Sequence, residues 1–290
     1  MDNLTMDLVQ LCRRNRDGSY GTQKNRQRGL TAIAGELDSL GYKLPSTRSI
    51  KPKHVAALIE KWQGSDLDDA TIRNRLTWLR WWAEKVDKRS VISRDNADYG
   101  VAARTGADIN RAKTFKLEKY RKIPCAHIRA AILLQASFGL RREEAMKFRP
   151  DVALRNDHIA LKASWTKGGR PRTIPITTDM QRRVLQRVSR VAKGGSLIPA
   201  NLTYAEQLKR YEYQTLNAGM RNTHGFRHAY AQHRYEALTG MQCPLNGGKR
   251  WQEMTAQERQ ADRAARRQIS GELGHGRLEV TDTYLGRALS

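Results

Sequence analysis

Apolar residues recur at the three- and four-residue spacing of α-helices along most of this 290-residue chain, and they alternate at strand spacing in one stretch. The helical spacing is found in residues 22–44, 51–62, 66–86, 124–148 and 178–194. In the one exception, Ile159, Leu161, Ala163 and Trp165 alternate before a Lys-Gly-Gly-Arg turn, and Thr173, Ile174 and Ile176 follow it. These patterns predict a β-hairpin on a mainly helical body.

The first hundred residues are expected to form amphipathic helices, with Thr22 as the cap of one and Pro52 at the start of another. Trp78, Trp81 and Trp82 are expected in the core of this part rather than as platforms for stacking bases, because aromatic residues carry much of a small helical core. The helical period is then lost in a stretch rich in Asn, Asp, Gly and Ala, which favours a linker.

The chain carries 53 Lys and Arg against 29 Asp and Glu, a formal net charge of +24. Such a charge opposes compaction unless a polyanion screens it. Nucleic acid is the favoured partner, with an anionic membrane or the ribosome as alternatives. No apolar run is long enough to span a membrane, and the first residues do not resemble a secretory signal. Three well-separated cysteines without a CxxC pair favour a reducing cytoplasm and argue against a zinc site.

Several polar motifs of the second half suit exchange of a phosphodiester. They are Arg141 in "FGLRREE", Lys167 in "TKGGRPR", His224 and Arg227 in "HGFRH", and His275 and Tyr284 in "LGHGRLEVTDTY". Guanidinium groups bind phosphate oxygens, a phenol oxygen can attack phosphorus, and an ammonium or imidazole can move the proton of the leaving oxygen. Each motif taken singly is more often an ordinary surface or packing feature, so it is their combination and order that point to this chemistry.

In that order the motifs resemble the tyrosine recombinase family, which includes the phage-integrase and Xer-like enzymes. The similarity covers essentially the whole chain and is less specific in the N-terminal half. It implies a mainly α fold with a small β-hairpin or sheet. The implied parts are a helical, SAM-like core-binding domain at 1–96, a linker at 97–117 and an α+β catalytic domain at 118–290.

The resemblance also implies a role for each side chain. Tyr284 would attack the scissile phosphate, forming a 3′-phosphotyrosine and releasing a 5′-hydroxyl. Arg141 and Arg227 would bind the non-bridging oxygens, and Lys167 would protonate the leaving 5′ oxygen. The remaining roles are His224 as acid or base toward the tyrosine oxygen, His275 as a hydrogen-bond partner of the phosphate, and Glu144 as support for the site around Arg141.

Double-stranded DNA is the implied partner, bound by a homotetramer that assembles on DNA from a protein expected to be a monomer in solution. Accessory DNA-bending proteins are a further class of partner that the family admits. No metal, ATP or other cofactor is implied, because arginines would supply the charge that divalent ions supply elsewhere. The alternatives are a type IB topoisomerase, a non-catalytic DNA-binding regulator on the same fold and a structural nucleoid protein. The full set of expected catalytic residues argues against the regulator, and the ordered motifs argue against the structural protein.

Two features depart from the family pattern. The segment between Arg227 and the "LGH" turn is long, and residues 241–268 are the predicted insertion, favoured as a solvated excursion over a contact with DNA or another subunit. Only six residues follow Tyr284, which are expected to contribute little to docking on a neighbouring subunit.

Overall fold

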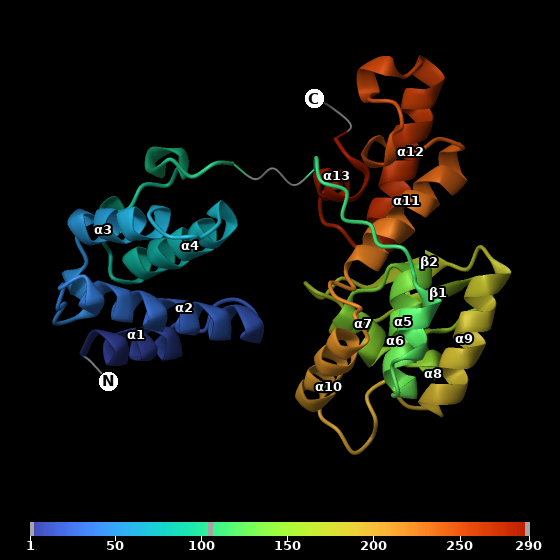
Figure 1. Ribbon diagram of the computed structural model, residues 1–290, viewed down its shortest axis with the longest axis horizontal. Coiled ribbons are helices and arrows are strands. Elements are labelled where there is room, and N and C mark those ends of the chain that lie inside the picture. The colour runs from blue at the N-terminus through green and yellow to red at the C-terminus, as the bar shows by residue number, and fades with distance from the viewer. Residues whose placement is uncertain (1–2, 104–106, 288–290) are drawn as a thin grey trace. The chain divides into compact units, whose positions relative to one another are not determined.

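The structure, a computed structural model, describes residues 3–103 and 107–287 (Figure 1). The chain divides into two compact units, Met1–Thr105 and Gly106–Ser290, and this division falls within the predicted linker at 97–117. Residues 104–106 of that linker lie outside the described residues. None of the described helices has the length and apolar character needed to cross a membrane.

The N-terminal unit is a bundle of helices around one apolar core (Figure 1). Its helices are α1 (Asn3–Arg14), α2 (Tyr20–Ser39), α3 (Pro52–Gln63) and α4 (Asp69–Lys85). Trp82 is completely buried and Trp78 and Trp81 pack partly buried against the same core, as predicted. The predicted cap at Thr22 is wrong: the Ser19 hydroxyl caps α2 by accepting the Thr22 backbone N–H, so the helix begins earlier.

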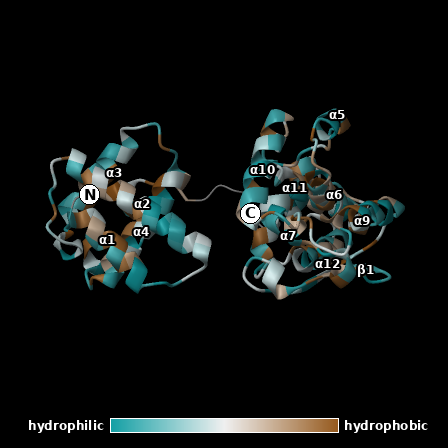
Figure 2. Ribbon diagram, turned by 90° about the horizontal axis from the view of Figure 1, so that it is seen from below, coloured by the Kyte–Doolittle hydropathy of each residue, from teal (hydrophilic) through white to brown (hydrophobic). Residues whose placement is uncertain are grey.

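The second unit surrounds the apolar helix α6 with further helices and one hairpin. Its elements are α5 (Leu117–Arg121), α6 (Ala126–Phe138), α7 (Arg142–Lys147), α8 (Pro150–Ala153), β1 (His158–Leu161), β2 (Arg172–Pro175), α9 (Asp179–Ala192), α10 (Tyr204–Asn217), α11 (Gly225–Thr239), α12 (Ala256–Leu273) and α13 (Asp282–Leu285). Helix α6 packs against α7, α9 and α11. Along the helices the ribbon changes between hydrophilic and hydrophobic colours (Figure 2), as expected for helices that bury one face. The predicted mainly helical fold with one hairpin is therefore confirmed.

The hairpin is a two-stranded antiparallel sheet in which Ile159 lies opposite Ile174. Both residues are fully buried against the core. The strand alternation predicted to continue to Trp165 is wrong, because β1 ends at Leu161 and Ala163–Trp165 form a short 3-10 helix, η4. This 3-10 turn places the centroid of the Trp165 ring 6.3 Å from that of Phe148. Packing between these side chains, rather than hydrogen bonding between strands, therefore decides the local structure.

The predicted insertion at 241–268 is not a solvated excursion throughout. Its second half forms most of α12, which packs against α11 and buries Asp262, Ala265 and Arg266. The two charged residues are 0% and 2% exposed and pair with each other at 2.9 Å. A buried charge is tolerated when it is paired in this way, which explains why so polar a segment lies inside the fold.

Candidate active site

Tyr284 lies at the meeting point of three segments of the second unit. It sits on the single-turn helix α13, and only 6% of its surface is exposed. Its hydroxyl lies 3.3 Å from Arg227 Nε and 3.3 Å from His224 Nε2, across 57 and 60 residues of sequence. Both distances are long for hydrogen bonds, so the hydroxyl is close to these groups without being tightly held by them.

Arg227, on α11, is completely buried. Its Nη1 donates to the Gly139 carbonyl at 2.6 Å, and its Nη2 donates to the Leu273 carbonyl. These carbonyls lie at the C-terminal ends of α6 and α12, where unpaired C=O groups favour a cation. Burial and the nearby charge of Arg141 lower the pKa of Arg227 to about 10, which leaves the guanidinium charged at neutral pH.

The turn at Gly139 requires glycine. Its φ is +61°, and a Cβ at this position would lie 2.6 Å from the ring of Tyr230. Both the left-handed conformation and the close approach exclude a side chain. The glycine of "FGLRREE" therefore places a carbonyl on Arg227 and directs the chain toward Arg141.

A buried carboxylate joins two more arginines beside the site. Glu144, on α7 and 1% exposed, accepts from Arg141 Nη1 at 2.8 Å and from the Arg141 backbone N–H at 2.7 Å. It also accepts from Nη1 and Nη2 of Arg172 at 3.0 and 2.7 Å. Burial alone would raise the pKa of Glu144, but the hydrogen bonds and charge of Arg172, with the charge of Arg141, lower it to about 2. Glu144 therefore stays ionised and holds both guanidinium groups.

Sequence reasoning missed Arg172, although a signal was present. Arg172 and Ile174 have the same phase in β2, and Ile174 is buried. An arginine on the inward face of a strand must find partners inside the protein. Besides Glu144, Arg172 donates from Nε to the Glu272 carbonyl at 2.8 Å.

The two predicted histidines also lie at Tyr284. His275 stacks on the tyrosine ring with centroids 5.1 Å apart, and its Nδ1 is 3.2 Å from the Thr281 hydroxyl. Burial and the charges of Arg227, Arg141 and Arg172 lower the pKa of His275 to about 3.

His224 stands immediately before α11, and part of its ring is open to solvent. Burial of its inner edge, with the charges of Arg227 and Arg141, lowers its pKa to about 4. Like His275 it is therefore neutral at neutral pH, and one nitrogen of a neutral ring can accept a proton.

A third histidine, His228, was not expected in the site. The residue is 3% exposed, and its ring lies 4.3 Å from that of Tyr284, centroid to centroid. Burial and the neighbouring His224 lower its pKa to about 4. The second histidine of "HGFRH" follows His224 by one helical turn on α11, and this spacing was the available signal.

Lys167 is separate from this cluster. It lies exposed in the turn between η4 and β2, and among the described residues its ammonium makes no hydrogen bond or ion pair. Gly168 and Gly169 follow it with φ of +81° and +66°, and a Cβ at either would meet no atom within 4 Å. The structure thus brings together Arg141, His224, Arg227, His275 and Tyr284, and it leaves the sixth predicted residue on a turn in open space.

The electrostatic character of the cluster is that of an anion site. Three guanidinium groups lie here, from Arg141, Arg172 and Arg227, and the carboxylate of Glu144 pairs with the first two. The charges of these arginines help to lower the pKa values of the neighbouring imidazoles. A doubly or singly charged phosphate would offset this excess positive charge. No group of three or more His, Cys, Asp or Glu side chains suited to a metal ion was found in the part of the chain that the structure describes.

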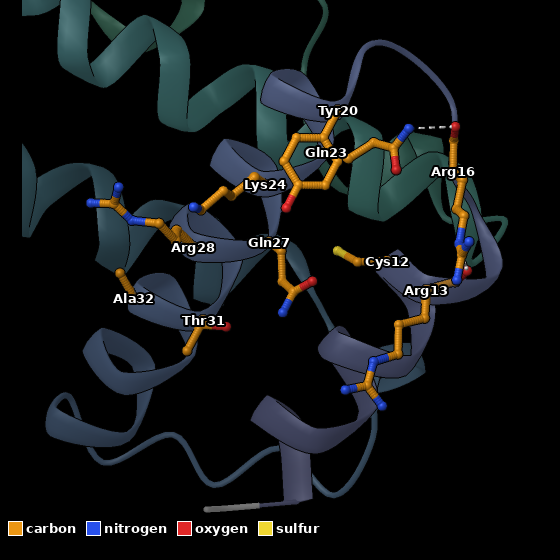
Figure 3. A pocket seen from close by; sticks show the side chains of 10 residues that line it. All are labelled: Cys12, Arg13, Arg16, Tyr20, Gln23, Lys24, Gln27, Arg28, Thr31 and Ala32. Carbon is orange, nitrogen blue, oxygen red and sulfur yellow. Dashed lines mark hydrogen bonds between the residues drawn. The ribbon is translucent and has the colours of Figure 1, made fainter. Parts of the chain in front are cut away.

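A second basic feature is a cavity of about 720 Å³ on the N-terminal unit, between α1 and α2 (Figure 3). Its cationic lining comes from Arg13, Arg16, Lys24 and Arg28. Tyr20, at the start of α2, borders it with 80% of its surface exposed. The side chain of Gln23, on α2, donates a hydrogen bond to the Arg16 carbonyl at 2.9 Å and so holds the loop that connects α1 to α2.

Two family models match the chain. The phage integrase N-terminal model matches residues 1–90, and the integrase model matches residues 100–233. The second match covers Arg141, Lys167, His224 and Arg227 but ends before Tyr284, so the position of the tyrosine rests on the geometry described above. No curated protein matches the chain by sequence.

Solved structures share the fold across both units. The XerH site-specific recombinase, bound to palindromic difH substrate in a post-cleavage complex, is 17% identical with a TM-score of 0.58, covering 97% of this chain and 80% of that one. A lambda integrase dimer bound to a COC′ core site is 16% identical with a TM-score of 0.63, covering 98% and 77%. The Tn1549 transposon integrase, in complex with circular intermediate DNA, is 16% identical with a TM-score of 0.57, covering 100% and 97%.

Proposed function

Because the chain belongs to the tyrosine recombinase family of phage-integrase and Xer-like enzymes, we propose that it cuts and rejoins duplex DNA through a covalent bond between Tyr284 and a phosphate. One observation carries this proposal beyond the family. The Tyr284 hydroxyl lies 3.3 Å from both a buried guanidinium and a neutral imidazole, and neither group is near it in sequence. This combination offers a nucleophile, an anion-binding group and a proton acceptor at one point.

In the proposed step the tyrosine oxygen attacks the scissile phosphorus. The new P–O bond joins Tyr284 to the 3′ side of the cut, the bond to the 5′ oxygen breaks, and His224 accepts the phenol proton. A neutral His224 can play this part because its pKa lies well below neutral pH. Arg141 and Arg227 bind the non-bridging oxygens, where charge develops in the transition state.

The leaving 5′ oxygen requires a proton, which we assign to Lys167. An ammonium group can donate a proton to such an oxygen. The lysine must move to the phosphate when DNA binds, and the open space around Gly168 and Gly169 allows that movement. The reverse reaction, attack of a 5′-hydroxyl on the phosphotyrosine, rejoins DNA without ATP, because the phosphodiester energy is retained in the covalent link. The arginines supply the charge stabilisation, so the proposed step uses no metal.

Duplex DNA is the proposed substrate on three grounds. The net charge is +24, the N-terminal unit carries a basic cavity lined by four cationic side chains, and XerH, lambda integrase and the Tn1549 integrase were solved with DNA. Contacts to phosphates supply most of the affinity in such complexes. Exchange between two duplexes requires four active sites, so we propose a homotetramer on DNA. We place the reaction in the cytoplasm, on the host DNA.

The test is a covalent trap that works without a defined target sequence. Nicked duplexes with a degenerate central sequence lose a short 5′-hydroxyl fragment on cleavage, which leaves the protein attached to DNA in detergent. The wild-type chain is expected to form this adduct, and sequencing of the attached DNA identifies the site. Mass spectrometry is expected to find the nucleotide on the tryptic peptide 278–287, whose only tyrosine is Tyr284. An adduct on another residue, or none, refutes the assignment.

A second assay separates recombination from relaxation. Two plasmids that carry the selected site are incubated with the wild-type chain, and the Tyr284→Phe variant serves as the control. Joined products are expected from a recombinase. Relaxed plasmids without exchange would indicate a topoisomerase instead. Tyr284→Phe is expected to bind the DNA and give neither product, because it lacks only the attacking oxygen.

A further inference from the structure

The helix that carries Tyr284 is too short to be stable by itself. α13 spans four residues, Asp282–Leu285, and follows the 3-10 helix η7 (Leu278–Thr281). Isolated helices of this length do not persist in water, because nucleation costs more than a single turn returns. The position of the tyrosine must therefore be set by contacts with the rest of the unit.

One side chain holds both ends of this turn. Arg266 Nη1 donates to the Asp282 carboxylate at 3.0 Å and to the Gly286 carbonyl at 2.9 Å. Its two acceptors lie two residues before and two residues after Tyr284. One guanidinium nitrogen of Arg266 therefore bonds to the chain on both sides of Tyr284.

Arg266 is itself held rigidly by a buried acid. Its Nε lies 2.9 Å from both oxygens of Asp262, which is fully buried. Asp262 also accepts the Tyr235 hydroxyl of α11 at 2.8 Å. Since α11 carries Arg227 and begins directly after His224, the contacts form a closed path. It runs from α11 through Asp262 and Arg266 to the tyrosine turn, and back to α11 through the Tyr284 hydroxyl.

We propose that Arg266, acting through Asp282 and the Gly286 carbonyl, is the positioning residue that aligns the nucleophile Tyr284 with Arg227 and His224. This inference rests on the proposed covalent chemistry. Arg266 makes no contact with the hydroxyl, so it acts through the backbone of α13 and not on the reacting atoms. The residue comes from the segment 241–268 that departs from the family pattern in length.

Other contacts anchor the turn without setting its direction. Leu285 is fully buried, and Gln232 donates to the Tyr284 carbonyl at 3.2 Å. Apolar burial stabilises the turn but tolerates rotation, because it is not directional. The two hydrogen bonds from the planar guanidinium of Arg266, one to a carboxylate and one to a carbonyl, are directional and restrict the rotation of the turn. Losing the Asp282 contact should therefore leave the turn docked but misaligned.

The test uses Asp282→Ala, because this change leaves the buried Arg266–Asp262 pair intact. Replacing Arg266 would strand Asp262 without its partner and is the less useful variant. Glu279→Ala is the matched control, since it removes the same charge from an exposed position in η7. Asp282→Asn tests rescue, because its amide oxygen can still accept from Arg266. Each full-length variant is assayed for folding, DNA affinity and single-turnover cleavage of the site selected by the covalent trap.

Asp282→Ala is expected to slow cleavage on the order of 10- to 100-fold, the effect of a misplacement near 1 Å. Folding and DNA affinity should match those of Glu279→Ala, and Asp282→Asn should recover most of the rate. The defect should persist on DNA with a sulfur at the 5′ bridging position, because a thiolate leaves without a proton and only the leaving-group step is relieved. Lys167→Ala, by contrast, should be rescued by the sulfur.

Three results would overturn the inference. The first is that Asp282→Ala cleaves as fast as Glu279→Ala, which shows that the contact does not align the tyrosine. The second is that Asp282→Ala loses DNA affinity as much as rate, which shows that the contact is only structural. The third is rescue of Asp282→Ala by the bridging sulfur, which shows that the contact serves the leaving group. If the wild-type chain forms no adduct, the proposed function fails and this inference fails with it.

Discussion

Replacing Glu144 by glutamine is expected to destabilise the second unit by about 3 kcal/mol at neutral pH. The pKa of this carboxyl falls from 4.5 to about 2 on folding, a difference that corresponds to roughly 3 kcal/mol of stability. Breaking a buried ion pair by removing one partner costs about 3–5 kcal/mol, which agrees. Glutamine keeps the shape of the side chain but leaves Arg172, whose side chain is 5% exposed, without its counter-charge.

The predicted loss depends on pH with a definite sign. The folded pKa of Glu144 lies below the unfolded value, so its contribution is fully present above about pH 4.5 and is lost as pH falls toward 2. The stability gap between the wild-type chain and Glu144→Gln should therefore shrink by about 2 kcal/mol between pH 7 and pH 3. Glutamine does not titrate, so the variant itself lacks this part of the acid sensitivity.

The assay is urea unfolding of the full chain, which gives the free energy of unfolding. Hydrogen exchange measured on peptides of the second unit shows that the loss of stability lies in that unit. Glu143→Gln is the matched control, because Glu143 lies beside Glu144 but pairs with Lys147 on the surface. An exposed pair of this kind contributes about 0–1 kcal/mol. A loss below about 1 kcal/mol for Glu144→Gln, or a gap that does not change with pH, would refute the view that this carboxylate organises the two arginines.

Three further predictions concern the proposed reaction. Arg227→Lys should lower the single-turnover rate of adduct formation about 100-fold or more, the usual effect of losing a donor to a transition-state oxygen, with urea unfolding as the control for folding. Arg13→Gln and Arg28→Gln should each reduce the slope of log affinity against log salt by about 0.9, measured by titration of duplex DNA at several salt concentrations. Since the pKa of His224 is about 4, kcat/KM should stay level from pH 8 to pH 5 and fall only as pH approaches 4; a fall centred near pH 6.5 would contradict a base whose pKa is lowered in this way.

Much of the fold could be predicted from local patterns. The helical period predicted the mainly α body and strand alternation predicted the hairpin, because both depend on which face of an element is buried. The errors arose where packing overrides pattern. The strand predicted to reach Trp165 ends at Leu161, and the polar segment 241–268 is partly buried because Asp262 and Arg266 satisfy each other.

The candidate site divides in the same way. Motif order predicted Arg141, His224, Arg227, His275 and Tyr284, and the structure brings these side chains together, while their chemical roles stay predictions. Arg172, His228 and Arg266 were missed, although the spacing of the first two carried a signal. Their contacts with Glu144, Tyr284 and Asp282, respectively, join elements that are separate in sequence. Lys167 was predicted from its place in the motif order, and its part in the reaction depends on DNA.

What the sequence alone determined is the kind of element formed by most segments and the order in which the reactive side chains occur. Both follow from local spacing. What only the tertiary structure decided is that the hydroxyl of Tyr284 meets Arg227 and His224. That meeting joins side chains 57 and 60 residues apart, and it depends on the packing of α13 against α11. Spacing within one element carries no information about such a contact, because the contact arises only when two elements pack against each other.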